Sequence, residues 1–235
     1  MSEELKAPIN EMFYSIQGEG KNLGKPALFI RLFGCNLRCR FNGENCDTPY
    51  AVLPGAPGAN NEMYTSKDIV KKIKSLGVTH IVWTGGEPML YQDFILECME
   101  KCDFFVTGEI ETNGTIAPNP KLNKYIELYT ISPKLKSSNQ ELVKYNRIRK
   151  NITPIYGFPP DKSYFKFVVT CKEDINEIKK LNFKFPRFDV YLMPQGTTRE
   201  EIIKNAPEIV EYCKKYDYKF SPREHLIIYD KKRGV

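Results

Sequence analysis

Three cysteines, Cys35, Cys39 and Cys46, fall within twelve residues and directly follow an apolar run. Thiolates are soft ligands that suit zinc or iron–sulfur clusters, and a loop after a strand can fold three of them around one centre. A structural zinc site normally has four protein ligands, whereas the next candidates along this chain are His80 and Cys98. Three ligands leave one coordination position open. The spacing therefore predicts a metal or cluster centre that takes part in chemistry.

Two less specific interpretations of these cysteines stay open at this point. Clustered cysteines form disulfides in small secreted proteins, but this chain has seven cysteines and its first residues are polar and acidic, unlike an export signal. The three could also be unrelated free thiols. Cys98 and Cys102, four residues apart on an expected helix, and His80, within an expected strand, are interpreted as packed core residues rather than ligands.

Polar residues at the ends of apolar segments indicate a ligand site. The segment Gln17 to Gly20 follows an aromatic stretch, and its glycines would let the backbone approach a ligand closely. Arg31 interrupts an apolar strand, where its charge needs either a bound carboxylate or an internal acid as a partner. The motif Thr84 to Pro88 ends another buried strand. Its paired glycines would expose backbone groups, and Glu87 would suit an ammonium group.

Strand and helix patterns alternate between these motifs. Such alternation implies parallel strands joined by right-handed crossovers, and barrel-like folds of this kind hold their active site at the carboxyl ends of the strands. Helices are expected at 67–76 (capped by Ser66 and ended by Gly77), 91–101, 173–181 and 199–215. Strands are expected at 27–33, 78–83, 104–109, 128–131, 164–170 and 188–193, with an edge strand within 221–229.

Length and composition predict one globular domain over residues 1–235. The chain has 41% hydrophobic and 27% charged residues, and no apolar run approaches the roughly 20 residues of a membrane helix. Without an export signal, we expect reduced cysteines and a cytoplasmic location. The net charge of +6 is mild and the lysines are scattered, which is typical of a solvated surface and compatible with an anionic small-molecule ligand. We expect neither direct nucleic-acid nor membrane binding.

Several motifs together resemble one family. The three cysteines resemble the CxxxCxxC cluster loop of radical S-adenosylmethionine (SAM) enzymes, with four extra residues in the second gap, and Gly-Gly-Glu-Pro is shared broadly by those enzymes. Within that group the chain resembles the 7-carboxy-7-deazaguanine synthases of 7-deazapurine biosynthesis, nearly from end to end. The residues that carry this resemblance are 13–20, 29–39, 46–48, 84–88, 111–115, 132–134 and 221–225.

The resemblance implies a truncated, incomplete (β/α) barrel of the radical SAM type, usually as a homodimer. The three cysteines would hold a 4Fe–4S cluster, whose remaining iron would bind SAM. A 5′-deoxyadenosyl radical would then take a hydrogen from 6-carboxy-5,6,7,8-tetrahydropterin, and ring contraction with loss of ammonia would give 7-carboxy-7-deazaguanine, on the route to queuosine or archaeosine. An electron donor such as flavodoxin or ferredoxin is expected. The protein binds and orients, while the cofactors carry the radical chemistry.

The resemblance also implies roles for individual residues. Thr48 would ligate Mg²⁺, a hard cation that prefers oxygen ligands. The C-terminal tail would contribute to the active site. SAM would contact Asn45, Asp47, Gly85, Gly86, Glu87, Ser132, Pro133, Lys134 and Gln195. The pterin would contact Ile16, Gln17, Gly18, Glu19, Arg31, Thr84, His225 and Val235.

One departure and two other functions stay open. In the family an aromatic residue directly precedes the third cysteine, whereas here Asn42 to Asn45 intervene. This insert contains an Asn-Gly turn signal, so we expect a small loop that returns Cys46 to the cluster. A different small radical SAM enzyme, such as a glycyl-radical activase, would share the cysteines without needing Arg31 or Thr48. A zinc-binding module that contacts tRNA or protein is the other alternative.

Overall fold

Five strands precede the first α-helix in the described part of the chain, and strands and helices mostly alternate from there on. A computed structural model describes residues 4–41, 44–138 and 157–235. Its strands are β1 (Lys6–Ile16), β2 (Pro26–Leu32), β3 (Arg40–Phe41), β4 (Glu44–Asn45), β5 (Glu62–Thr65), β6 (His80–Gly85), β7 (Thr107–Thr112), β8 (Ile126–Ile131), β9 (Ser163–Val169), β10 (Asp189–Pro194) and β11 (Lys219–Phe220). Its helices are α1 (Ser66–Leu76), α2 (Gln92–Lys101), α3 (Lys172–Lys184), α4 (Arg199–Tyr216) and α5 (Glu224–Tyr229).

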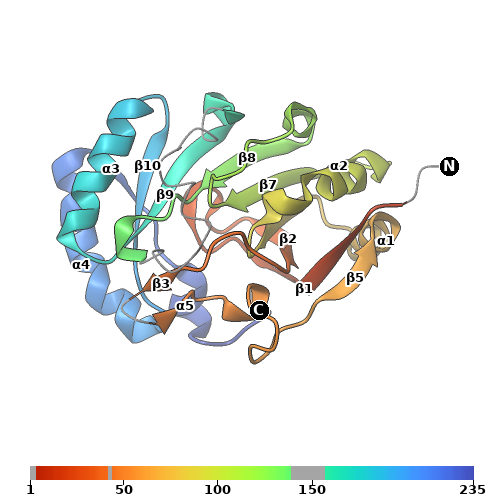
Figure 1. The fold of residues 1–235 in the computed structure, drawn as a ribbon, viewed down its shortest axis with the longest axis horizontal. Coiled ribbons are helices and arrows are strands. Elements are labelled where there is room, and N and C mark those ends of the chain that lie inside the picture. Colours follow the sequence, from red (N-terminus) through yellow and green to blue (C-terminus); the bar gives the residue numbers. More distant parts are fainter. Residues whose placement is uncertain (1–3, 42–43, 139–156) are drawn as a thin grey trace.

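One open sheet of nine strands organises these elements, in the order β11-β10-β9-β8-β7-β6-β2-β1-β5 (Figure 1). Neighbours from β2 to β11 pair in parallel, whereas β1 pairs antiparallel with both β2 and β5. The sheet does not close, because β11 and β5 remain at its two edges. The predicted truncated, incomplete (β/α) barrel is therefore confirmed.

The two faces of the sheet differ in polarity. Ile30, Trp83 and Phe165 are fully buried in the apolar core. Helices α1 and α2 lie at one end of the fan of strands and α3 and α4 at the other (Figure 1). Because successive side chains of a strand point to opposite faces, Arg31 and Lys166, which follow Ile30 and Phe165, belong to the other face. That face is lined by polar groups.

Two predicted boundaries near the first helices are wrong. Thr65, not Ser66, caps α1: its hydroxyl accepts a hydrogen bond from the Asp68 backbone N–H at 3.2 Å, while its own N–H donates to the Asp68 carboxylate at 2.9 Å. This reciprocal pair is a capping box. The strand predicted at 104–109 begins later, as β7, and includes Glu109 and Glu111. The strand continues through these two acids because they lie on its polar face.

The predicted edge strand within 221–229 is also wrong, because residues 224–229 form helix α5. The apolar run suggested a strand, yet within it only Leu226 is buried. Arg199 donates hydrogen bonds to the carbonyl oxygens of Ile227 and Ile228, at 2.7 and 3.0 Å. These carbonyls at the end of the helix would otherwise lack partners. A contact with α4 thus stabilises the helix in a way that local sequence does not reveal.

The insert before the third cysteine forms a hairpin. Arg40 pairs with Asn45 and Phe41 with Glu44, so β3 and β4 are joined by the two residues 42–43, which lie outside the described residues. The predicted Asn-Gly turn itself lies outside the described residues. Beyond the hairpin, the Cys46 backbone N–H donates to the Cys39 carbonyl at 3.0 Å. The insert therefore returns Cys46 beside Cys39.

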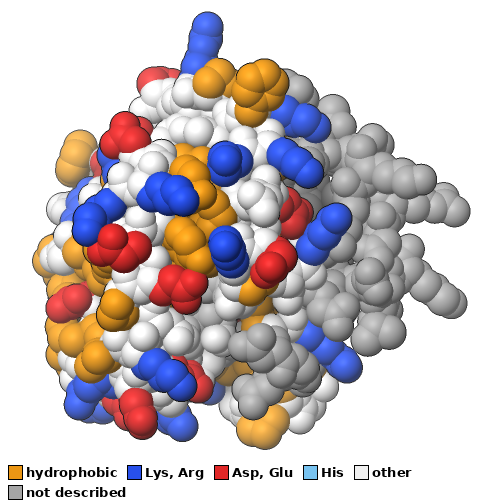
Figure 2. Space-filling model, turned by 90° about the vertical axis from the view of Figure 1, so that its left-hand side faces the viewer, with side chains coloured by type: hydrophobic (Ala, Val, Ile, Leu, Met, Phe, Trp, Pro, Cys, Tyr) orange, Lys and Arg blue, Asp and Glu red, His pale blue; other side chains and the backbone are white. Residues whose placement is uncertain are grey.

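The surface seen in Figure 2 is the side of the molecule that lies at the left in Figure 1. Lysine and arginine side chains are interspersed there with aspartate and glutamate, so this face presents no field of a single sign. Among the described helices, none has the length and apolar character needed to span a bilayer.

Candidate active site

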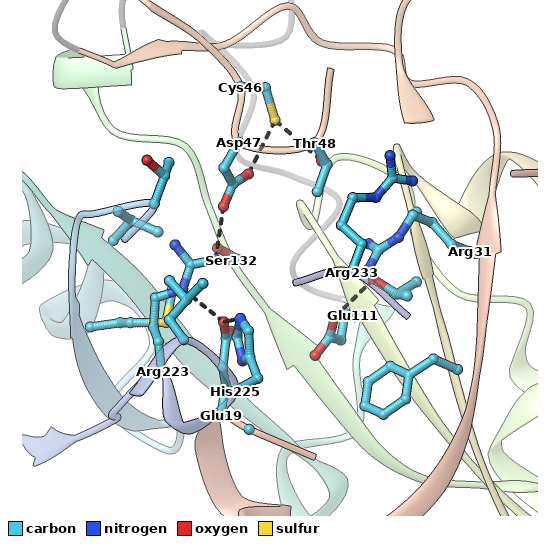
Figure 3. A pocket seen from close by; sticks show the side chains of 18 of the residues that line it. Glu19, Arg31, Cys46, Asp47, Thr48, Glu111, Ser132, Arg223, His225 and Arg233 are labelled. Carbon is cyan, nitrogen blue, oxygen red and sulfur yellow. Dashed lines mark hydrogen bonds and ion pairs between the residues drawn. The ribbon is translucent and has the colours of Figure 1, made fainter. Parts of the chain in front are cut away.

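A cavity of about 460 Å³ lies at the carboxyl ends of the parallel strands, and Figure 3 shows it closely. Almost every residue predicted for the site lines it, from Ile16 near the N-terminus to Val235 at the end of the chain. Glu87 and Pro133 are not among the lining residues, and Asn45 lies in β4 with its side chain outside the described part. The cavity thus brings together three thiols and the residues expected around a pterin.

The three thiols share one end of this cavity. Burial raises the pKa of Cys35 to about 11 and that of Cys39 to about 12, so both are protonated until a metal displaces the proton. The Leu37 backbone N–H donates to the Cys35 sulfur at 3.4 Å, and the Cys46 sulfur lies 3.5 Å from the Thr48 hydroxyl. Hydrogen bonds to such sulfurs tune the potential of an iron–sulfur cluster.

The Gly-Gly-Glu-Pro motif packs the end of β6 against the end of β2. A Cβ on Gly85, whose φ is +136°, would lie 2.1 Å from the Leu32 carbonyl oxygen, so only glycine fits. Glu87 is fully buried, and its carboxylate accepts hydrogen bonds from the backbone N–H groups of Met89 and Asn113 and from the Thr112 hydroxyl. Glu87 thus joins β6 to β7, rather than presenting its carboxylate to the cavity.

Arg31 has an internal partner and also faces the cavity. Its Nε donates to Glu11 at 2.7 Å, which is the salt bridge that one interpretation of this residue required. Its two terminal nitrogens form no hydrogen bond with the described residues. Glu11 also pairs with Arg233 of the C-terminal tail at 3.0 Å. The arrangement fixes the Arg31 guanidinium in place while leaving its fork available to a carboxylate.

A second set of charged residues surrounds Glu19 at the other end of the cavity. The Glu19 carboxylate pairs with Lys166 of β9 and, at 3.1 Å, with Arg223, which reaches Asp47 of the cysteine loop at 3.0 Å (Figure 3). Burial would raise the pKa of Glu19, but the two cations hold it well below its usual range. Glu19 is therefore a carboxylate at neutral pH, and Arg223 connects the two ends of the cavity.

His225 comes from α5 and lies close to the early glycine loop. The Glu224 backbone N–H donates to the Gly18 carbonyl at 2.9 Å, and a Cβ on Gly18 would lie 2.4 Å from Nδ1 of His225. Gly18 is required because α5 packs directly on it. Burial lowers the pKa of His225, and the nearby cations Arg223 and Lys166 lower it further although Glu19 opposes them. His225 is accordingly a neutral imidazole at pH 7.

Several charged lining residues were absent from the predicted site, among them Lys166, Glu111, Arg223 and Arg233. Lys166 and Glu111 lie within strands. A charged residue within an expected strand was the signal that could have identified them, as it did for Arg31. Arg223 belonged to a recognised motif but had no assigned role. Arg233 lies over the ring of Tyr50, with its guanidinium carbon 3.4 Å from the ring centre, and nothing local in the sequence indicates this contact.

Comparisons with known proteins agree with this geometry. A family model described as the radical SAM superfamily matches residues 29–206. The chain is 33% identical to the 7-carboxy-7-deazaguanine synthase of Pyrobaculum aerophilum over the whole of both chains. It is 33% identical to that of Clostridium acetobutylicum over 97% of this chain and 98% of the relative. Its fold is similar to the crystal structure of QueE from Escherichia coli, with a TM-score of 0.70, 24% identity and coverage of 94% and 95% of the two chains.

The open barrel and the family match place the chain in the radical SAM superfamily. Within that superfamily, its likeness to relatives of equal length shows that it belongs to the 7-carboxy-7-deazaguanine synthase family. The resemblance noted in the sequence is thereby confirmed. Membership supports SAM and an iron–sulfur cluster as cofactors.

The donor set fits such a cluster. All three thiols line one cavity, yet no three potential ligands among the described residues are grouped closely enough for a single metal ion. In a 4Fe–4S cluster each thiolate binds a different iron, so its ligands stand further apart than the four around one zinc ion. The three thiols on one cavity wall thus fit the cysteine ligands of such a cluster.

Proposed function

We propose that the chain converts 6-carboxy-5,6,7,8-tetrahydropterin to 7-carboxy-7-deazaguanine with release of ammonia, as a radical SAM enzyme of 7-deazapurine biosynthesis. One observation carries the proposal: a single cavity holds the three thiols together with Arg31, Thr48, Gln17 and Glu19. A cluster held by Cys35, Cys39 and Cys46, together with SAM, would supply the radical chemistry. The other residues select and orient the pterin.

Each end of the cavity suits one part of this substrate. The fork of Arg31 matches the 6-carboxylate, and Thr48 offers a hydroxyl to a Mg²⁺ ion that would bridge protein and substrate. Glu19, Gln17 and the neutral His225 offer acceptors and donors to the pterin ring. Ser132, Lys134, Gln195 and the Gly85-Gly86 backbone would surround SAM.

The tail supports a small-molecule substrate over a glycyl-radical partner. Arg233 and Val235 line the cavity from the end of the chain, so the site is covered where a protein partner's backbone would have to enter. We further propose one domain over residues 1–235, a homodimer, an electron donor such as flavodoxin or ferredoxin, and a cytoplasmic location, which keeps the seven free cysteines reduced.

The proposal predicts that Arg31→Ala and Thr48→Ala separate two activities. Turnover of the carboxytetrahydropterin should fall by at least about tenfold, because a hydrogen bond to a charged group contributes roughly 1.5–3 kcal/mol. Reductive cleavage of SAM without pterin should change little. Both are measured anaerobically on reconstituted protein with Mg²⁺ and reductant, following 7-carboxy-7-deazaguanine and 5′-deoxyadenosine by mass.

Thr48→Ser is the matched control, since it keeps the hydroxyl and should retain most of the turnover. Equal loss of both activities with the cluster intact would contradict the substrate assignment and favour a different radical SAM reaction.

A further inference from the structure

Lys166 is a lysine in the middle of a buried strand. Its side chain is 6% exposed, and its neighbours Phe165 and Phe167 on β9 are fully buried in the core. A buried ammonium is costly unless it is paired, so its presence here calls for a reason. Lys166 also lines the cavity, although neither the cluster nor the 6-carboxylate requires it.

The contacts of Lys166 leave part of its donor capacity unused. Its Nζ pairs with Oε2 of Glu19, and Oε1 of Glu111 lies 3.9 Å away, beyond hydrogen-bond distance. An ammonium has three N–H donors. Within the described part of the chain, Glu19 alone accepts a hydrogen bond from this one. Lys166 can therefore donate to a ligand in the cavity.

The two carboxylates beside Lys166, those of Glu19 and Glu111, also accept hydrogen bonds from other side chains. Arg223 occupies the other oxygen of Glu19, while Gln17 and Thr84 donate to the two oxygens of Glu111 at 3.1 and 2.8 Å. Arg223 is shared between Glu19 and Asp47, so it and Lys166 together face three carboxylates when Glu111 is included. The Lys166 ammonium lies at the cavity wall directly beside the Glu19 acceptor, and a donor and an acceptor side by side form a recognition pair.

The donor and acceptor of this pair are complementary to those of a pterin's lactam edge. A carboxylate oxygen accepts and an adjacent ammonium donates, whereas the pterin offers the N3–H donor beside the C4 oxo acceptor. We propose that Lys166 determines substrate specificity: it donates to the 4-oxo group of the pterin and positions Glu19 to accept from N3–H. The inference rests on the proposed function and names the part of the substrate that this end of the site reads.

Two non-reactive ligands test the proposal by binding alone. Pterin-6-carboxylate carries the lactam edge, and 2,4-diaminopteridine-6-carboxylate replaces it with an amino donor beside an unprotonated nitrogen. Calorimetric titration of the reconstituted, SAM-loaded protein should show preference for the first. Lys166→Met should weaken binding of pterin-6-carboxylate by about tenfold or more and that of the diamino compound by much less, because a buried polar site rejects ligands that leave it unpaired.

Two further variants keep this test decisive. Lys162→Met removes a lysine at the start of the same strand, whose Nζ donates to the Asn123 and Ile126 carbonyls away from the cavity, and it should leave both affinities unchanged. Lys166→Gln keeps an N–H donor and should retain part of the preference even if Lys166→Met unfolds.

The outcomes separate two failures. If Lys166→Met and Lys166→Gln both keep the wild-type preference for the lactam, or if both lose affinity for the two ligands equally, only the role of Lys166 is overturned. Wild-type protein that binds neither pteridine overturns the proposed function and this inference with it.

Discussion

At the scale of residues, each buried charge of the cavity finds its partner far away along the chain. Glu19 pairs with Arg223, 204 residues later, and Gln17 donates to Glu111 across 94 residues. Such pairs are stable only in the assembled fold, since removing one partner leaves an uncompensated buried charge. The polar lining of the cavity and the closure of the fold therefore depend on each other.

The cysteines allow a prediction at this scale. Cys39→Ala should abolish both bound iron and activity, because two thiolates cannot hold the cluster securely. Cys98→Ala is the matched control: Cys98 is fully buried and lies outside the cavity, so iron content should stay intact. Iron and sulfide analysis after anaerobic reconstitution measures both. A full complement of iron in Cys39→Ala would show that the third ligand is a different group.

The same scale explains what sequence reasoning could reach. The thiols were recognised by their spacing and Gly85 by the paired glycines at a strand end. The positive φ of Gly85 and its close approach to Leu32 are visible only in the structure. Lys166 was missed because a lysine in a strand normally reaches solvent with its ammonium. Only the tertiary position of Glu19 shows that this ammonium stays inside. The tertiary contacts of Glu87 were likewise not predictable from the sequence, since two of its three donors, the Thr112 hydroxyl and the Asn113 backbone N–H, come from another segment.

At the scale of elements, α5 shows how a tertiary contact decides secondary structure. Its residues favour a strand by composition, yet it is helical where Arg199 binds its last carbonyls and Gly18 accepts the backbone N–H of Glu224. The helix in turn places His225 beside the early glycine loop. A short helix depends on such contacts, because isolated helices of this length are unstable in water.

Arg199→Ala should therefore act at a distance. Loss of its hydrogen bonds should fray α5, displace His225 and lower pterin turnover by several-fold, consistent with about 0.5–1.5 kcal/mol for each hydrogen bond. Iron content and pterin-independent SAM cleavage should remain as in the wild type. Arg187→Ala, at an exposed arginine outside the cavity, serves as control. Unchanged pterin turnover in Arg199→Ala would mean that α5 holds its place without this contact.

At the scale of the whole molecule, an open barrel leaves the cavity to be covered by other segments. The sheet ends at β5 and β11 without closing, and both the cysteine loop and the C-terminal tail contribute to the cavity wall. Figure 1 places the C-terminus near β1, on the side of the molecule that the fan of strands leaves open. The alternation of strand and helix patterns predicted that the strands pair in parallel and that the site lies at their carboxyl ends. That alternation did not predict the path of the tail, because its last residues have no periodicity.

Arg233 attaches the tail to the cavity wall. Arg233 stacks on Tyr50 and shares Glu11 with Arg31, so it connects the tail to the arginine that we propose to bind the substrate. Arg233→Ala should lower pterin turnover by about tenfold, as loss of a partly buried charge pair and a cation–π contact would, while SAM cleavage without pterin persists.

A C-terminal extension by two residues separates the roles of Arg233 and the terminal carboxylate. It leaves Arg233 in place but moves the carboxylate away from Val235. If the tail acts only through its attachment, the extended protein should turn over pterin at the wild-type rate. If the carboxylate of Val235 also contacts substrate, the extension should raise KM for the pterin while leaving the affinity for SAM unchanged. We expect the second result, because Val235 itself lines the cavity. A wild-type KM in the extended protein would restrict the tail's function to Arg233.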